Sequence, residues 1–592
     1  MTALNQSPLP LGEGQGEGSN LPASTVLTQN LPLLAGAPNG IKKLRELILE
    51  LAVRGKLVPQ DTSDEPAREL LKRIAEEKAR LVAEGKLKKQ KALAEITEEE
   101  KPFGLPEGWC WASLNEIAAM RGGSTPSMSK SEFWGGDIPW VSPKDMHDGD
   151  ITDSELKVTQ LALDKTSLEL VPIGSILLVG RSGILKRKLP AQITAVPCTI
   201  NQDLKAISPF QPQPSDYVQL MLRGTERVIL KEDVKQGTTV QSLVYDKLFV
   251  RPFGLPPLAE QHRIVAKVDE LMALCDRLEA QQADAESAHT QLLQALLNSL
   301  IQASDATDFS TNWQRLAEHF HTLFTTEPSI DALKQTLLQL AVMGKLVPQD
   351  PSDEPAGEDL VKELAHQRNE VRRSGRIRES KEAIDFSGLD EMKICIPPNW
   401  NWVRMSEIAE VVRGGSPRPA GDPQFYGGDI PFLKVADITA IKGKYLEGYS
   451  STIKEAGLKK TRYIDAQTVL LTNSGATLGV PGICNFPASF NDGVAAFIEK
   501  SDLVFDEYLY LYLKTLTKWF LTIASRGQGQ PNLNTDIIKS TWFALPPLAE
   551  QHRIVAKVDQ LMALCDQLKT RLTQARQLNE QLACTLVEQA VA

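Results

Sequence analysis

Apolar positions over residues 258–300 recur at steps of three and four, the spacing that predicts one face of a long helix. No Pro or Gly interrupts this stretch, which would span about 65 Å at 1.5 Å per residue. Gln282 and His289 are polar positions within the pattern, of the kind that can set the register of a coiled coil. The apolar residues predicted to form this heptad seam are Ile264, Val268, Leu271, Cys275, Leu278, Ala285, Leu292 and Leu296.

Similar patterns predict further helices and strands. A second long helix is expected over 548–590. Shorter amphipathic helices are expected over 41–53 and 330–342, each ended by a glycine. The charged stretch 66–100 fits a solvated helix with i,i+4 ion pairs, or alternatively a basic segment near DNA or a partner. Further helices are expected over 216–231 and 506–522, and apolar strands that run into glycine-rich turns over 175–183 and 468–479.

The sequence contains two copies of one repeating unit of about 290 residues. LPPLAEQHRIVAKVD occupies both 255–269 and 545–559, and LAVRGKLVPQDTSDEPA (51–67) returns as LAVMGKLVPQDPSDEPA (340–356). FWGGDIPW (133–140) returns more loosely as FYGGDIPF (425–432). All offsets lie between 289 and 292 residues. The near-identical helical flanks predict two equivalent supports related by approximate twofold symmetry. The two diverged middle blocks predict two domains that read different targets.

Each middle block, 105–254 and 396–544, mixes strand and helix patterns, so each is expected to be an α/β globule. The fold class predicted for the chain is α+β: two α/β domains separated by long antiparallel coiled-coil helices, in a pseudo-twofold repeat of about 290 residues. The 592 residues exceed what one core usually supports, in agreement with several domains.

Composition narrows the class of protein. The net charge is −10, yet 105–254 holds 16 basic against 17 acidic residues and 396–544 holds 15 against 14, so the acidity lies in the flanks. Seven scattered cysteines without a CxxC argue against a disulfide framework or a zinc site and favour the reducing cytoplasm. No apolar run is long enough to cross a membrane. The Gly-, Pro- and Ser-rich residues 1–40 predict a disordered tail.

Catalytic signatures are missing from the sequence. It contains no GxxxxGK[ST], HExxH or GxSxG motif. Asp137-Ile-Pro-Trp140 and Asp429-Ile-Pro-Phe432 resemble the [DN]-P-P-[FYW] motif of amino-methyltransferases, but Ile replaces the first Pro. A strand start with a buried aromatic is the favoured interpretation, and no metal site is expected.

Polar residues in or beside turns of the two blocks are candidates for DNA contact. Arg suits guanine edges, Asn and Gln suit adenine edges, and Lys suits phosphates. The three consecutive cations of ILKRK (184–188) form the most pronounced positive spot. The candidates are Arg121, Lys144, Arg181, Lys186, Arg187, Lys188, Gln236 and Gln241 in the first block, and Arg413, Arg418, Lys434, Asn473, Arg526, Gln528, Gln530, Asn532 and Asn534 in the second.

The repeated segment at the start of each long helix is a candidate partner surface. His262 and His552 occupy the same repeat position, without a second metal ligand one turn away. A shared structural or partner contact is therefore favoured over a metal or catalytic role. The residues predicted to contact a partner are Leu258, Gln261, His262 and Val265, and in the second copy Leu548, Gln551, His552 and Val555.

These strings together resemble the specificity (S) subunit of type I restriction-modification systems. The resemblance rests on G-G-(S/T)-P…(W/Y)-G-G-D-I-P-(W/F) opening each block, L-P-P-L-A-E-Q closing each, and G-K-L-V-P-Q in the flanks, and it covers about 41–592. It implies the following division: tail 1–40, N-terminal conserved helical region 41–104, target-recognition domain 105–254, central conserved region 255–395 (with the second repeat starting over 330–385), second target-recognition domain 396–544, and C-terminal conserved helix 545–592.

The resemblance also implies the partners. Each target-recognition domain would read one half of a bipartite DNA site, asymmetric because the blocks differ, while the helices space the domains and dock two methyltransferase (M) subunits. S-adenosylmethionine would belong to the M subunits, and ATP and Mg²⁺ to two restriction (R) subunits, so this chain would hold no cofactor and catalyse no reaction. Two alternatives remain open: a fused adenine methyltransferase and a coiled-coil scaffold without DNA readout.

Overall fold

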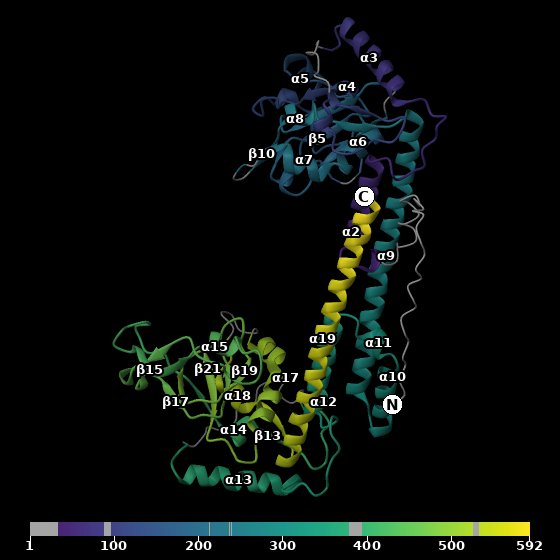
Figure 1. Cartoon of the computed structure of the whole chain (residues 1–592). Helices are drawn as coiled ribbons and strands as arrows, with labels where there is room; N and C mark the ends of the chain where they lie inside the picture. The colour runs from purple at the N-terminus through teal and green to yellow at the C-terminus, as the bar shows by residue number, and fades with distance from the viewer. Residues whose placement is uncertain are drawn as a thin grey trace. The chain divides into compact units, whose positions relative to one another are not determined.

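The chain forms two compact units in the computed structural model. The first contains residues 1–285 and 575–592, and the second contains 286–574. Each unit carries an α/β domain and helices (Figure 1). The tail predicted over 1–40 lies almost entirely outside the described residues. The residues that the structure describes are 34–87, 96–147, 149–211, 214–235, 237, 240–377, 393–524 and 532–591.

The first α/β domain is built on an antiparallel four-stranded sheet of order β2-β9-β5-β7. A second sheet, β4-β3-β8, pairs β3 with β8 in parallel. The apolar strand β5 is buried along its length and is paired on both sides, with β9 and with β7. The bounds are β2 (Ala118–Gly122), β3 (Trp134–Val141), β4 (Leu156–Val158), β5 (Ile176–Val179), β7 (Ala191–Ile193), β8 (Thr199–Ile200) and β9 (Leu204–Pro209).

The second α/β domain repeats this plan. Its sheet β14-β21-β18-β19 matches the first four-stranded sheet, and β16-β15-β20-β17 matches the second with one added strand. Again one pair, β15 with β20, is parallel. The bounds are β14 (Glu410–Arg413), β15 (Tyr426–Leu433), β16 (Thr452–Ile453), β17 (Arg462–Ile464), β18 (Thr468–Thr472), β19 (Pro481–Cys484), β20 (Ala488–Phe490) and β21 (Val494–Ile498).

Each domain is closed by pairing its first strand with its last. In the first unit β1 (Cys110–Ala112) runs antiparallel to β12 (Phe253–Leu255), and in the second β13 (Asn401–Arg404) pairs with β22 (Trp542–Leu545). The chain therefore enters and leaves each domain at one place. The long helix begins three residues after the closing strand in each case, so each domain is joined to its helix at this ladder.

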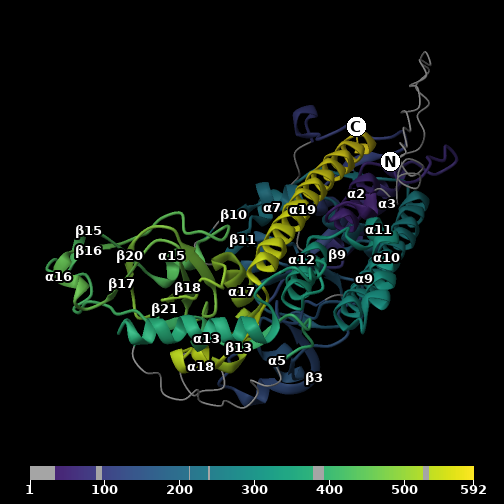
Figure 2. The same cartoon turned by 90° about the horizontal axis from the view of Figure 1, so that it is seen from below.

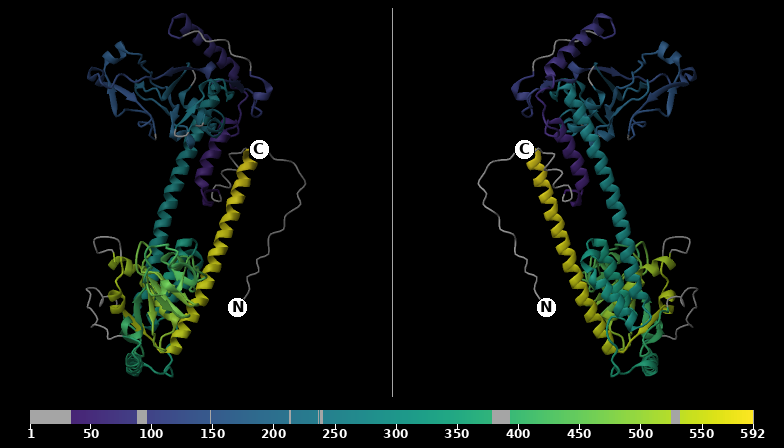
Figure 3. Two further views of the ribbon diagram at one scale, coloured as in Figure 1. Left: turned by 90° about the vertical axis from the view of Figure 1, so that its left-hand side faces the viewer. Right: turned by 90° about the vertical axis from the view of Figure 1, so that its right-hand side faces the viewer.

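The two predicted long helices are confirmed as α9 (Leu258–Gln302) and α19 (Leu548–Val591), which Figure 3 shows as uninterrupted. In the first unit, α2 (Gly40–Val53) packs against the start of α9 and the end of α19 in one hydrophobic core. In the second, α12 (Glu327–Val342) packs against the start of α19 and the end of α9. Each unit thus holds the beginning of one long helix and the end of the other, as an antiparallel pair requires.

The continuous heptad seam predicted along α9 is wrong in its second half. Ile264, Val268 and Cys275 are buried as expected, but Ala285 is exposed and Leu292 is 55% exposed. The core instead takes Leu293, Leu297 and Leu300, one position further along. The reason is a change of packing partner, because the first part of α9 belongs to one hydrophobic core and its last turns to another. A single seam cannot serve both.

Other predicted helices are found with altered ends. The segment 216–231 forms two helices, α6 (Ser215–Gly224) and α7 (Glu226–Glu232), separated at Thr225. The segment 506–522 forms α17 (Asp506–Ala524). The charged stretch gives α3 (Ala67–Ala83), where Arg80 pairs with Glu77 and Glu84 at 2.7 and 2.9 Å, as expected for a solvated face.

Further helices contribute to the second unit. Helix α13 (Gly357–Arg373) packs against β13 and α14 (Met405–Ile408), at the lower side of the second domain in Figure 2. Helices α10 (Ala306–Glu318) and α11 (Phe320–Leu323) lie between α9 and α12 in the chain and add Leu316, Leu323 and Phe324 to the bundle core.

Candidate functional site: two reading domains and their helical roots

The DIPW and DIPF segments lie inside strands. Asp137–Trp140 belongs to β3 and Asp429–Phe432 to β15. Trp140 is 7% exposed and meets Trp134 edge-on at 5.2 Å, while Phe432 is 1% exposed and meets Tyr426 edge-on at 5.8 Å. These aromatics fill the interior of the sheets, which confirms the prediction of a buried aromatic. Each motif begins three residues after the start of its strand, so the prediction of a strand start is wrong.

Glycine is required in these segments because neighbouring backbone atoms approach it closely. A Cβ atom on Gly136 would overlap the carbonyl oxygen of Val158, and one on Gly428 would overlap that of Ile453. The residue before each has positive φ, 80° at Gly135 and 78° at Gly427, which favours glycine. The shared GG pair therefore serves the fold of both domains.

The turn after β5 collects exposed cations in the first domain. Arg181, Lys186, Arg187 and Lys188 are exposed around a short 3₁₀ turn at Gly183–Lys186, and we refer to these four as the basic turn. Leu185, which is 1% exposed, anchors the turn in the domain core. The antiparallel pairing of Arg181–Ser182 with Gln241–Ser242 holds its first residues. A rigid support thus carries a positive surface.

A polar cleft of about 710 Å³ adjoins the basic turn, lined by Lys144, Arg181, Asn201, Gln202 and the rim of Trp140, among others. Acidic residues also line it, but both oxygens of Asp145 already accept backbone N–H groups, from Ser142 and Glu155. Two predicted reading residues, Lys144 and Arg181, therefore meet at one site.

The corresponding turn of the second domain has different chemistry. Asn473, the residue after β18, matches Gly180, the residue after β5, because their carbonyl groups accept the N–H groups of Leu533 and Leu243, respectively. The bridge of Ser474 with Asn532 therefore matches the pairing of Arg181 with Ser242. Asn473 and Gln241 are both 0% exposed, which speaks against direct base contact by either side chain. The sequence patterns did not reveal this burial.

The remaining candidates are distributed around the domains. Arg121 is half-buried and donates to Ser208 Oγ at 3.1 Å, and Lys434 is half-buried at the start of a short helix. Arg413 is exposed, with its Nε donating to the Asp492 carbonyl at 2.6 Å, and Arg418 is exposed. Asn532 and Asn534 are exposed, and Asn534 caps α18 (Thr535–Ser540). Gln236, Arg526, Gln528 and Gln530 lie outside the described residues.

The predicted partner surface divides into exposed and buried members. His262 and His552 are exposed, and the His552 ring lies 4.0 Å from that of Phe505. Leu258, Val265 and Leu548 are half-buried. Gln261, Gln551 and Val555 are buried within their own units, so they contribute to the fold, and partner contact remains a prediction for the exposed members.

The repeated motifs meet in a part-buried polar cluster at the root of the first domain. The Glu260 carboxylate accepts hydrogen bonds from Trp109 Nε1 and from Gln60 Nε2, both at 2.9 Å. Arg263, one turn later on α9, forms two hydrogen bonds to Asp64 at 2.5 and 3.2 Å. We call these five residues the first root cluster. It joins LPPLAEQ, GKLVPQ and the Trp before β1, which are separated by up to 200 residues.

The second root cluster has the same geometry. Glu550 accepts from Trp400 Nε1 at 2.9 Å and from Gln349 Nε2 at 2.6 Å. Arg553 bonds Asp353 at 2.6 and 2.9 Å. Glu260 and Glu550 are 1% and 0% exposed. Burial raises the pKa of both carboxyls above the usual range, although their hydrogen bonds act in the opposite direction.

Comparison with known proteins identifies the family. The type I restriction modification DNA specificity domain matches residues 106–286 and 397–576. The EcoEI specificity subunit of Escherichia coli is 36% identical over 571 residues, which covers 93% of this chain and 94% of the relative. The EcoAI specificity subunit of the same organism has the same identity and coverage. The chain belongs to the specificity subunits of type I restriction enzymes.

Solved structures include an HsdS subunit from Thermoanaerobacter tengcongensis. It is 18% identical, with a TM-score of 0.40, and the match covers 83% of this chain and 98% of that one. The general role of specificity subunits is to provide DNA-sequence specificity, and they are non-catalytic. Within the described residues of this specificity subunit, no helix is long and apolar enough to cross a membrane.

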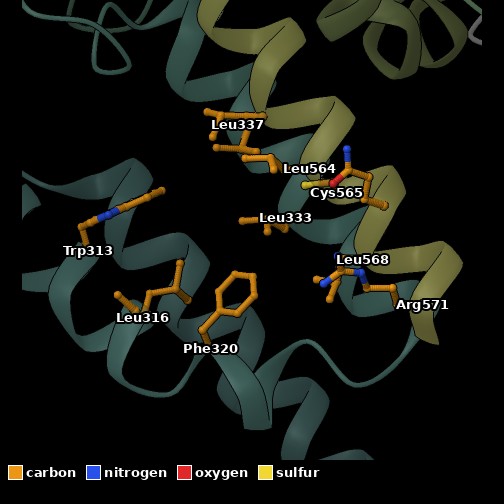
Figure 4. Close-up of a pocket in the computed structure, with 12 residues that line it drawn as sticks. Trp313, Leu316, Phe320, Leu333, Leu337, Leu564, Cys565, Leu568 and Arg571 are labelled. Carbon is orange, nitrogen blue, oxygen red and sulfur yellow. The ribbon is translucent and has the colours of Figure 1, made fainter. Parts of the chain in front are cut away.

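The specificity subunit also has an apolar pocket of about 370 Å³ in its second unit (Figure 4). Trp313, Leu316 and Phe320 of α10 and α11 face Leu333 and Leu337 of α12 and residues of α19 across it. Gln567 and Arg571 are its amide and charged members. It lacks a set of convergent polar groups, so it offers no site for acid–base or nucleophilic chemistry.

Proposed function

We propose that this chain reads a split, asymmetric DNA site, with each α/β domain reading one half. The main support is the contrast inside the repeat: the two domains share sheets, closing ladder and root cluster, but their turns after β5 and β18 differ. The first turn presents exposed cations, whereas the exposed residues of the second turn, Ala476 and Thr477, are uncharged. Equal supports with unequal reading surfaces fit two different half-sites.

The first domain is expected to contact DNA through its basic turn and the adjoining cleft. Arg181 is exposed at the cleft and has a side chain suited to a guanine edge. Lys186 and Arg187 are exposed next to it and suit phosphates. Phosphate contacts would set the register of the domain, and Arg181 would contribute sequence discrimination.

The two helical supports dock one methyltransferase (M) subunit each in this proposal. Its support is the near-identity of 255–276 and 545–566, which places His262 and His552 on equivalent exposed faces. Two restriction (R) subunits complete the complex. S-adenosylmethionine would be bound by the M subunits, and ATP and Mg²⁺ by the R subunits.

The decisive experiment is a long-read map of methylated adenine in a host that expresses this chain together with its neighbouring M subunit. A split, asymmetric motif that disappears when this chain is omitted is the expected result, and it would give both half-sites at once. Methylation that persists without the chain would refute the reading role. A palindromic motif would refute the assignment of different half-sites to the two domains.

A further inference from the structure

The root clusters lie where each reading domain joins its long helix. Trp109 is in the segment that enters the first domain, one residue before β1, and Glu260 is on the first turn of α9, just after the domain ends. Gln60 and Asp64 come from the loop that follows α2. The cluster therefore connects three separate chain segments: the flank, the domain entrance and the helix that leaves the domain.

The contact between Trp and Glu in each cluster is directional and shielded from water, whereas the pair between Arg and Asp is part-buried, with 36% of each arginine side chain exposed. Trp109 is 8% exposed and its indole N–H points at a carboxylate that is 1% exposed. The pairing of Arg263 with Asp64 is two-pronged, a geometry that restricts rotation as well as distance. Glycine permits close packing beside it, because a Cβ on Gly55 would overlap Pro106 and Trp109. Such a joint resists both bending and twisting.

The second unit repeats this joint although its reading domain has diverged. Gln349, Asp353, Trp400, Glu550 and Arg553 make the same five-residue arrangement. Gly344 likewise approaches Pro397 and Trp400. The joint is thus independent of which sequence the attached domain reads.

We propose that the root clusters are positioning devices that hold each reading domain at a fixed orientation on its long helix, and so enforce the gap between the two half-sites. This rests on the proposed function. One added base pair moves a half-site by about 3.4 Å and rotates it by about 35° around the DNA axis. A reading domain that can swing on its helix would tolerate this change, whereas a domain locked by Glu260 and Arg263 would not.

The test uses the full chain assembled with its M subunits and DNA duplexes that carry both half-sites at the native gap or at one base pair more or less. Asp64→Arg and Arg263→Asp each break the two-pronged pair, and the double variant restores it with reversed charges. Glu260→Gln is a milder variant that keeps the side-chain volume. Lys72→Ala removes an exposed pair with Glu69 on α3, outside the segment 255–276, and serves as the matched control.

We expect each single variant to lower the preference for the native gap at least about tenfold, measured as the ratio of Kd values, while both half-sites are still required. The double variant should recover the preference, and Lys72→Ala should not change it. Weaker binding or a lower Tm at an unchanged gap preference would overturn the proposal, because it is the result of a purely structural role. The proposal would also be overturned if the charge-reversed single variants lost binding, the double variant did not restore it, and Glu260→Gln lost binding as well. If the unmodified complex shows no split site, the proposed function itself fails.

Discussion

Replacing Lys186 and Arg187 with glutamine tests whether the basic turn contacts DNA. Both side chains are exposed on a turn anchored by the buried Leu185, so their removal should leave the domain folded. Each phosphate contact contributes about 0.9 to the slope of log K against log salt concentration, so two lost contacts reduce that slope by about 1.8. Between roughly 50 and 200 mM salt, the variant would then lose about twelvefold less affinity than the unmodified complex.

The assay is a fluorescence anisotropy titration of the chain with its M subunits on a duplex that contains the recognised site, repeated over a range of salt concentrations. The matched control replaces Lys165 and Lys231, two exposed lysines elsewhere in the first domain. Because phosphate contacts carry no sequence information, the methylated motif should not change. An unchanged slope, or an equal change in the control, would refute the assignment of the basic turn to the DNA surface.

Three further predictions follow from single residues. Arg181→Ala should lower the discrimination at one guanine of one half-site by about 1–3 kcal/mol. A methylation map would show this as a degenerate position in the motif. A change in the other half-site would contradict the assignment. Leu293→Ala should destabilise the chain by about 2–5 kcal/mol in chemical denaturation, and Leu292→Ala by no more than about 0.5 kcal/mol. The reason is that Leu293 is 5% exposed and Leu292 is 55% exposed. Equal effects would contradict the shifted seam and favour the seam predicted through Leu292. Because the pKa of Glu260 is raised on folding, the folded state holds its proton longer, so this residue's contribution to stability is greatest at low pH and falls as pH rises above about 4.5. The melting temperature of Glu260→Gln relative to the unmodified chain should accordingly rise across that range, and a pH-independent difference would contradict it.

Local pattern and internal repetition were sufficient for much of this protein. The helical period over 258–300 depends on neighbours three and four residues apart, so α9 could be predicted almost to the residue. The repeat of LPPLAEQHRIVAKVD by itself indicates two equivalent supports. The position of ILKRK beside a glycine turn was enough to predict the exposed basic turn.

Tertiary structure decided what depends on residues far apart in the chain. In the sequence, Glu260 has the pattern of an ordinary carboxylate in the first turn of a helix. Only the fold brings Trp109 and Gln60 to it, from 151 and 200 residues away. The seam of α9 shifts at Leu293 because its packing partner changes, which no period within the helix can encode. Asn473 is a plausible base reader by residue type, yet the fold leaves it buried directly after β18. Periodicity reports which face of a segment is apolar, whereas burial and polar pairing depend on which distant segment covers that face.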